Sequence, residues 1–165
     1  MTRMSERIEP MTLCDLRSVL AKHERFWGER DLRFLHLRAL VQEFGDTCLV
    51  ARGPGGRIDG YLLGFTTPSR TGYIHAVAVR DEARGTGCAT ALYRAFAAAA
   101  AGHGATRLKA ITNLINTGSV AYHRRLGFHV EQVDDYDGPG VPMMVMTRPL
   151  PFAASGGEQD RSEGE

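Results

Sequence analysis

The most informative chemical feature of the chain is its glycine-bearing loop, Arg84-Gly85-Thr86-Gly87-Cys88-Ala89. A loop of this kind between a strand and a helix presents backbone N–H groups at the positive end of the helix dipole, and its small residues let a diphosphate approach closely. Two glycines can also serve a tight turn alone. The loop therefore predicts either an anion-binding cradle or a simple chain reversal.

Two well-known phosphate-binding loops do not match this segment. A P-loop requires Gly-Lys-Ser/Thr, and no lysine follows these glycines. A Rossmann fingerprint requires a small residue where Thr90 stands and an acidic residue about 20 positions later, whereas residues 106–112 contain no carboxylate. A nicotinamide-dependent enzyme is therefore disfavoured.

A buried strand and an amphipathic helix are expected to position the loop. Residues 73–79 have the length and composition of a central strand, and residues 87–102 carry apolar side chains at helical spacing. The turn signals at 53–56 predict a hairpin, and Asn116 and Gly127 are expected to cap and close another helix. The remaining periodicities predict strands at 8–13, 47–51, 58–65, 107–112, 128–133 and 142–148, and helices at 14–24, 30–44 and 116–126.

Composition limits the function classes. The 165 residues suit one domain, which we expect at 1–150, followed by a mobile tail at 151–165. The chain is 43% hydrophobic and 24% charged with a net charge of +1, so no global field favours nucleic acid or an anionic membrane as a partner. The three cysteines, Cys14, Cys48 and Cys88, suggest neither a disulfide framework nor a zinc site, and a reducing cytoplasm fits best.

Two motifs in the chain are similar to those of a known enzyme superfamily. Val77-Ala78-Val79, followed after four residues by Arg-x-x-Gly-x-Ala, resembles motif A of the GCN5-related N-acetyltransferase (GNAT) superfamily. Asn116-x-x-Ser119-x-x-Tyr122-His123-x-x-Leu126-Gly127-Phe128 resembles its motif B. The motifs occur in the family order, and with element order included the resemblance covers roughly residues 5–150.

The resemblance implies a fold, a cosubstrate and a binding surface. The expected fold is α+β in three layers, with a mixed, mostly antiparallel sheet of six to seven strands that splays between the fourth and fifth strands. Acetyl-coenzyme A is the implied cosubstrate, and no metal is implied. The residues expected to hold it are Val77, Ala78, Val79, Arg84, Gly85, Thr86, Gly87, Cys88, Ala89, Thr90, Asn116, Ser119 and His123.

The chain departs from motif B at the position of the family's tyrosine, which is thought to protonate the departing thiolate. His123 stands there, and Tyr122 occupies the preceding position. Adjacent helical residues point in different directions, so Tyr122 does not simply inherit the role. Either His123 protonates the thiolate as an imidazolium, or both residues only pack beside the cosubstrate and water delivers the proton.

The acceptor side offers a candidate base and candidate binding residues. His75 is the only group titrating near neutral pH on the central strand, so it is either the base, directly or through water, or a hydrogen-bonded structural histidine. Trp27 is expected as an aromatic wall or a core residue. Asp134 and Tyr136 lie in an acidic loop that either attracts a cationic amine or is a solvated turn.

The function that the resemblance implies is direct transfer of an acetyl group to a primary amine of a small molecule or peptide in a ternary complex. The other class of function is a non-catalytic acyl-coenzyme A sensor, which needs neither a base nor a proton donor. A different acyl group or a hydroxyl acceptor also stays open. Homodimers are common in the superfamily, but no residue here identifies an interface.

Overall fold

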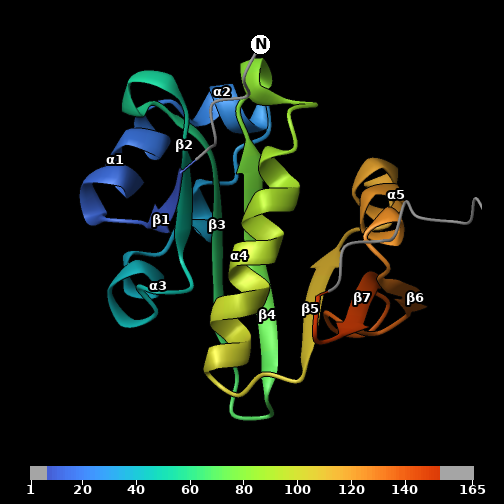
Figure 1. The fold of residues 1–165 in the computed structure, drawn as a ribbon. Helices are drawn as coiled ribbons and strands as arrows, with labels where there is room; N and C mark the ends of the chain where they lie inside the picture. The colour runs from blue at the N-terminus through green and yellow to red at the C-terminus, as the bar shows by residue number, and fades with distance from the viewer. Residues whose placement is uncertain (1–6, 153–165) are drawn as a thin grey trace, which may run out of the picture.

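The computed structural model describes residues 7–152, which form a seven-stranded sheet with helices on both faces (Figure 1). The strands lie in the order β1-β2-β3-β4-β5-β7-β6. Their bounds are β1 (Arg7–Pro10), β2 (Leu49–Arg52), β3 (Ile58–Thr66), β4 (Thr71–Val79), β5 (Arg107–Thr112), β6 (His129–Val133) and β7 (Met143–Pro149). β4 and β5 run parallel, and the other neighbouring pairs run antiparallel, which confirms the expected mixed sheet. Of the tail expected at 151–165, residues 153–165 lie outside the described residues.

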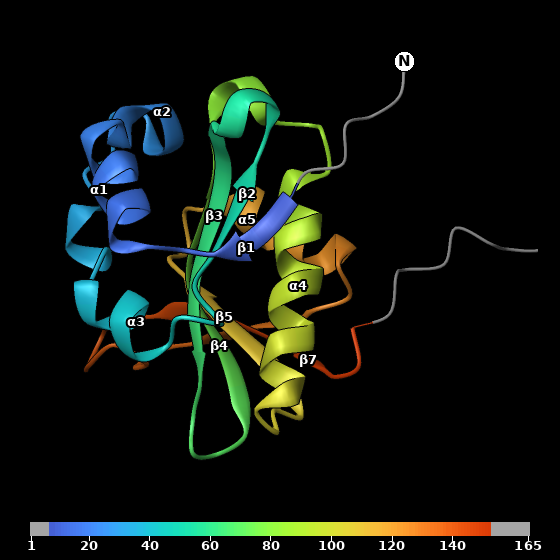
Figure 2. The ribbon, with the colours of Figure 1, turned by 60° about the vertical axis from the view of Figure 1, so that its left-hand side comes forward.

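The helices form two layers around the sheet (Figure 2). One layer contains α1 (Leu13–Ala21), α2 (His23–Trp27) and α3 (Arg38–Glu43). The other contains α4 (Cys88–Gly102) and α5 (Thr117–Arg125), and single 3-10 turns lie at η1 (Arg33–Leu35), η2 (Pro54–Gly56) and η3 (Asp81–Ala83). Within residues 7–152, no helix is long and apolar enough to cross a membrane.

Alternation along β2 and β3 divides the core into two clusters, one on each face of the sheet. Leu49 and Leu62 pack beneath α4, whereas Val50 and Leu63 pack beneath α1 and α3. The contact with α4 is close, because a Cβ atom at Gly64 would lie 2.5 Å from the ring of Phe96. This close packing fixes α4, and with it the loop that precedes α4, relative to β4.

The helix expected at 30–44 is the main error in the sequence prediction. Residues 28–37 form an irregular segment containing only η1, and α3 begins at Arg38. Two imidazoles hydrogen bond to the Leu32 backbone in this segment: the Leu32 N–H donates to His23 Nε2 at 3.1 Å, and His36 Nδ1 donates to the Leu32 carbonyl at 2.8 Å. The helix expected at 14–24 is divided into α1 and α2, and the strand expected at 8–13 ends at Pro10.

Candidate active site

β4 and β5 separate partway along their length, as Figure 1 shows. They pair only from Thr71 to Ile74 on β4 and from Arg107 to Ala110 on β5. Beyond Ile74 this edge of β4 pairs with no other strand of residues 7–152, and a cavity of about 420 Å³ lies there. Its lining includes Trp27, Arg30, Tyr73, His75, Val77, Tyr93, Asn116, Ser119, His123 and Asp137. We call this cavity the splay cleft.

A bulge in β4 lies at the base of the splay cleft. The register between β3 and β4 shifts by one residue at His75. As a result the strand reverses its alternation: Ile74 packs on the α4 face, Ala76 packs on the α1–α3 face, and Val77 packs on the α4 face. A bulge re-aims side chains and interrupts backbone pairing. His75 is therefore brought into the splay cleft by a local defect in the sheet.

The backbone beyond the bulge presents hydrogen-bond donors to the splay cleft. The Arg80 N–H donates to the Asp59 carbonyl at 2.8 Å, on the β3 side of the strand. Successive N–H groups of a strand point to opposite edges, so the N–H groups of Val77 and Val79 point to the edge that β5 has left. Such donors suit a carbonyl oxygen that gains negative charge during acyl transfer.

His75 is held in one tautomer. Its Nε2 lies 2.9 Å from the Leu35 carbonyl oxygen, which can only accept, so Nε2 carries the proton. In the neutral ring Nδ1 is then an acceptor, and it has no hydrogen-bond partner within residues 7–152. The arrangement gives the splay cleft an oriented imidazole that can receive a proton.

His123 lines the same cleft but is fully engaged. Nδ1 lies 2.7 Å from the Ser119 carbonyl oxygen, and Nε2 lies 2.7 Å from the Tyr93 hydroxyl. Because the carbonyl accepts from Nδ1, the Tyr93 hydroxyl donates to Nε2. Burial lowers the pKa of His123 below its ordinary value. The imidazolium considered from the sequence is therefore disfavoured at neutral pH, since burial penalises the charged form.

The neighbouring motif B residues have structural partners. The Tyr122 hydroxyl lies 3.1 Å from Thr90 Oγ1 in the first turn of α4, and Tyr122 is not among the residues that line the splay cleft. Asn116 caps α5 as expected, because its side-chain oxygen accepts from the Ser119 N–H at 3.3 Å. Asn116 and Ser119 also line the splay cleft, so the cap of α5 forms part of its wall.

The glycine loop has the geometry of an anion cradle. Gly85 and Gly87 have φ values of +75° and +87°, a backbone conformation in which residues with a side chain are strained. A Cβ atom at either position would meet no atom within 4 Å. Among the described residues, no side chain caps the first turn of α4. Arg84 extends outward, within 3.2 Å of Asp81 and 3.5 Å of the Phe26 carbonyl. The loop thus combines open space, an uncapped helix start and a cation.

Of the residues expected to bind the acceptor, only some line the splay cleft. Trp27 lines the splay cleft and donates from Nε1 to the Tyr61 hydroxyl at 2.7 Å. In the acidic loop Asp137 lines the splay cleft, whereas Asp134 accepts from Gln132 on the exposed surface and Tyr136 lies beneath the Lys109 ammonium at 4.9 Å.

Several residues of the splay cleft were missing from the sequence-based set. From the sequence, Tyr93 is predicted only as a core position of α4, although its hydroxyl contacts His123. The Leu35 group that contacts His75 is a backbone carbonyl, which no residue type can predict. Arg30 stands directly beside the expected aromatic wall, with its guanidinium 5.5 Å from the Trp27 ring. The short distance along the chain from Trp27 is the one signal that points to Arg30. Within residues 7–152, no group of three His, Cys, Asp or Glu side chains is arranged to hold a metal ion.

Two sequence comparisons match parts of the chain to known acetyltransferases. The profile described as "Acetyltransferase (GNAT) family" matches residues 14–128. A stretch of 58 residues, 33% of the chain, is 41% identical to the L-2,4-diaminobutyric acid acetyltransferase of Bordetella parapertussis. That match spans 31% of the relative's length, well under two thirds of it.

Solved structures share the fold at low sequence identity. Ard1 from Thermoplasma volcanium is 18% identical with a TM-score of 0.71, over 90% of this chain and 99% of that one. The NatB acetyltransferase complex bound to CoA and MES contains a chain that is 19% identical with a TM-score of 0.69, over 88% of this chain and 99% of that one. These likenesses confirm the expected fold.

Proposed function

Because the chain belongs to the GNAT acetyltransferase family, we propose that it transfers an acetyl group from acetyl-coenzyme A directly to a primary amine of a small molecule or peptide. The observation that carries the proposal is the splay cleft, where an oriented His75 and the free backbone edge of β4 lie together. A cavity with a few convergent polar groups is the usual form of a small-molecule site.

The residues before and within the first turn of α4 fit the diphosphate of coenzyme A. Their glycines leave open space, their N–H groups lie at the positive end of a 15-residue helix, and Arg84 adds a positive charge at the surface. When bound, acetyl-coenzyme A supplies an activated thioester. We assign its thioester end to the N–H groups of Val77 and Val79, which can stabilise the developing oxyanion.

His75 is the proposed general base. An alkylammonium has a pKa near 10, so an amine acceptor must lose a proton before it attacks. The Leu35 carbonyl keeps the imidazole's own proton on Nε2. Nδ1 is then able to receive the proton that the amine loses, directly or through water. Holding both reactants in one cleft removes much of the entropic barrier, and direct transfer needs no covalent enzyme intermediate.

Water is the proposed proton donor to the departing thiolate. His123 is buried and neutral with both nitrogens in hydrogen bonds, and the Tyr122 hydroxyl faces Thr90. His123 lines the splay cleft with its ring nitrogens already hydrogen bonded, and Tyr122 is not one of the residues that line it. In this proposal His123 is a positioning residue, which holds the Tyr93 hydroxyl and the first turn of α5 in place.

The charges of the splay cleft favour an acceptor that carries both an ammonium and a carboxylate. Asp137 and Arg30 line it, so one acid and one guanidinium face the same space. A diamino acid has both groups, and the relative from Bordetella parapertussis is named for such a substrate. We infer that small amino acids with a second amine are acceptors to test first.

The test is release of free coenzyme A thiol from acetyl-coenzyme A across diamino acids, monoamines, polyamines, aminoglycosides and peptides. We expect turnover with diamino acids and product acetylated on nitrogen, identified by mass spectrometry. Turnover with another amine alone would overturn the assigned acceptor class. Binding of coenzyme A without turnover on any acceptor would support the sensor function instead.

A further inference from the structure

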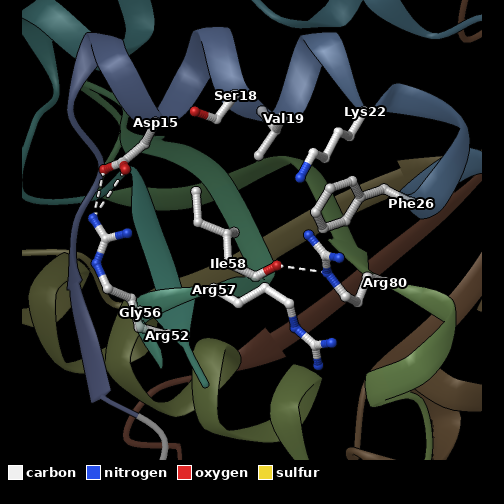
Figure 3. A pocket seen from close by; sticks show the side chains of 10 residues that line it. All are labelled: Asp15, Ser18, Val19, Lys22, Phe26, Arg52, Gly56, Arg57, Ile58 and Arg80. Atoms are coloured by element: carbon white, nitrogen blue, oxygen red, sulfur yellow. Dashed lines mark hydrogen bonds and ion pairs between the residues drawn. The ribbon is translucent and has the colours of Figure 1, made fainter. Parts of the chain in front are cut away.

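A second cavity, of about 220 Å³, lies on the α1 side of the molecule, away from the splay cleft. Its walls come from α1, α2, the turn between β2 and β3, and the end of β4 (Figure 3). We call it the α1 pocket. It is lined by Asp15, Ser18, Val19, Lys22, Phe26, Arg52, Gly56, Arg57, Ile58 and Arg80. The proposed acetyl transfer uses none of these side chains.

The α1 pocket has more positive than negative charge. Its lining contains four cationic side chains and one carboxylate. Two of the cations are neutralised nearby: Arg52 Nη2 contacts both carboxylate oxygens of Asp15 at 2.9 Å, and Arg57 Nε contacts Asp59 at 2.8 Å. The other two, Lys22 and Arg80, have no carboxylate within 4.0 Å in the described part of the chain.

Arg80 is an unusual residue because it is buried and, among residues 7–152, has no carboxylate within ion-pair distance. It is only 7% exposed. Its Nε donates to the Ile58 carbonyl at 2.8 Å, and its guanidinium lies 5.3 Å from the centre of the Phe26 ring. These contacts fix the plane of the guanidinium while its terminal nitrogens make no hydrogen bond within residues 7–152. A buried charge without a counter-ion is costly, so an anion bound there would offset a cost that the fold already carries.

Lys22 approaches the same space from another element. It follows α1 directly, and Figure 3 shows its ammonium directed into the hollow between α1 and the Phe26 ring. Arg80 enters from the end of β4, below that ring. Glu82, two residues beyond Arg80, forms its ion pair with Arg25 at 3.5 Å and interacts with Arg80 only at longer range. The pocket thus offers a planar donor and a point charge to one ligand.

We propose that the α1 pocket binds a small oxyanion of the phosphate type, as a free ion or as the phosphate of a small metabolite. Two uncompensated cations match a doubly charged anion better than a single carboxylate. The coenzyme A loop leads into α4, whereas the α1 pocket lies on the α1 side of the sheet. Arg84 of that loop contacts the carbonyl of Phe26, which lines the α1 pocket, so the two sites are neighbours and the test must distinguish them. The proposal does not depend on acetyl transfer.

The test is isothermal titration of the whole chain with inorganic phosphate at constant ionic strength, with and without saturating coenzyme A. We expect one phosphate per chain in both conditions, and weaker binding of acetate. Lys22→Gln should weaken phosphate binding about tenfold, the loss expected for one charge-assisted contact. Arg17→Gln removes the same charge from an exposed position of α1, the helix that Lys22 follows, and lies outside the pocket, so the phosphate affinity of this variant should stay close to that of the parent.

Three results would overturn the proposal. One is the absence of saturable phosphate binding. Another is an equal loss in Lys22→Gln and Arg17→Gln, which would indicate general charge attraction. The third is loss of phosphate binding when coenzyme A is present, which would place the ion at the start of α4. Lys22 is exposed, so its replacement tests the site without removing the buried contacts of Arg80.

Discussion

At the scale of single residues, His75 is the group whose replacement tests the proposed chemistry most directly. Glutamine keeps a donor for the Leu35 carbonyl but cannot accept a proton at neutral pH. We expect His75→Gln to lower kcat/KM by about 10² to 10⁴, the usual contribution of a general base, and to leave the affinity for coenzyme A unchanged. The measurement is steady-state thiol release together with calorimetric titration of coenzyme A.

The matched control for His75 is His103. That side chain is half exposed and contacts Asp46 at the far end of α4, so His103→Gln should keep the parent rate. If His75→Gln also keeps the parent rate, water reaches the amine without this residue. His75 would then be a structural histidine that ties β4 to Leu35.

His123 and Tyr122 test where the thiolate receives its proton. Because His123 is neutral and fully hydrogen bonded and Tyr122 faces Thr90, we expect His123→Gln and Tyr122→Phe each to lower kcat by less than tenfold. Pre-steady-state and steady-state rates of thiol release measure this. A loss of more than about 10² in only one variant would identify that residue as the donor and contradict delivery by water.

At the scale of elements, the loop before α4 carries the binding of coenzyme A. Gly87→Glu places a carboxylate where the diphosphate is expected, and it adds a side chain at a φ of +87°. We expect the dissociation constant for coenzyme A to rise by more than about 10², the loss that like charge at an anion site produces. Gly102→Glu, at the other end of the same helix and open to solvent, is the control. Equal affinity for coenzyme A in both variants would contradict the assignment of this loop as the diphosphate site.

Elements with local signals could be read from the sequence, and elements fixed by distant contacts could not. The strand at 107–112 and the helix at 87–102 follow from local periodicity, and the structure has both within one residue. The apolar spacing that predicted a helix at 30–44 lies at Leu37, Leu40, Val41 and Phe44. The residues before it are not α-helical, because the rings of His23 and His36 hydrogen bond to the Leu32 backbone. Both contacts are close along the chain, but the His36 ring is itself held by a distant residue, because its Nε2 lies 2.6 Å from the Tyr61 hydroxyl on β3. Tertiary contacts of this kind can override local propensity.

The same distinction holds for the candidate site. His75 could be identified as a titratable residue on a central strand, but the bulge that turns it into the splay cleft depends on the register with β3. The Tyr93 hydroxyl that occupies His123 comes from another helix. Such pairings across the fold decide the protonation state of a group, and one sequence without its fold does not contain them.

At the scale of the whole molecule, net charge conceals local charge. The chain carries a net charge of +1, which excluded a global field for polyanions. In the described part of the chain, the fold nevertheless places four cationic side chains around the α1 pocket, and two of them form close ion pairs with acids. A net charge near zero therefore does not exclude a local anion site, because acidic residues elsewhere on the surface balance the cations of the pocket in the total.

Two buried histidines make the stability of the whole fold depend on pH. Burial lowers the pKa of His36 and of His123 below the ordinary value of 6.5. Well above pH 6.5 both are neutral in the folded and unfolded states, so they add no slope. Below it the unfolded chain binds protons that the folded chain excludes, and the free energy of unfolding falls by about 1.4 kcal/mol per pH unit for each histidine until the folded pKa is reached.

Urea unfolding between pH 8 and pH 5 measures this slope. His36 lies between Tyr61, whose hydroxyl is 2.6 Å from Nε2, and the Leu32 carbonyl, so His36→Gln lowers stability at every pH but should flatten the fall below pH 6.5. His129→Gln replaces a histidine whose side chain is 75% exposed and should leave the slope unchanged. A slope in His36→Gln as steep as in the parent would show that other groups cause the loss, because only a residue excluded from protonation in the fold can couple folding to pH in this direction.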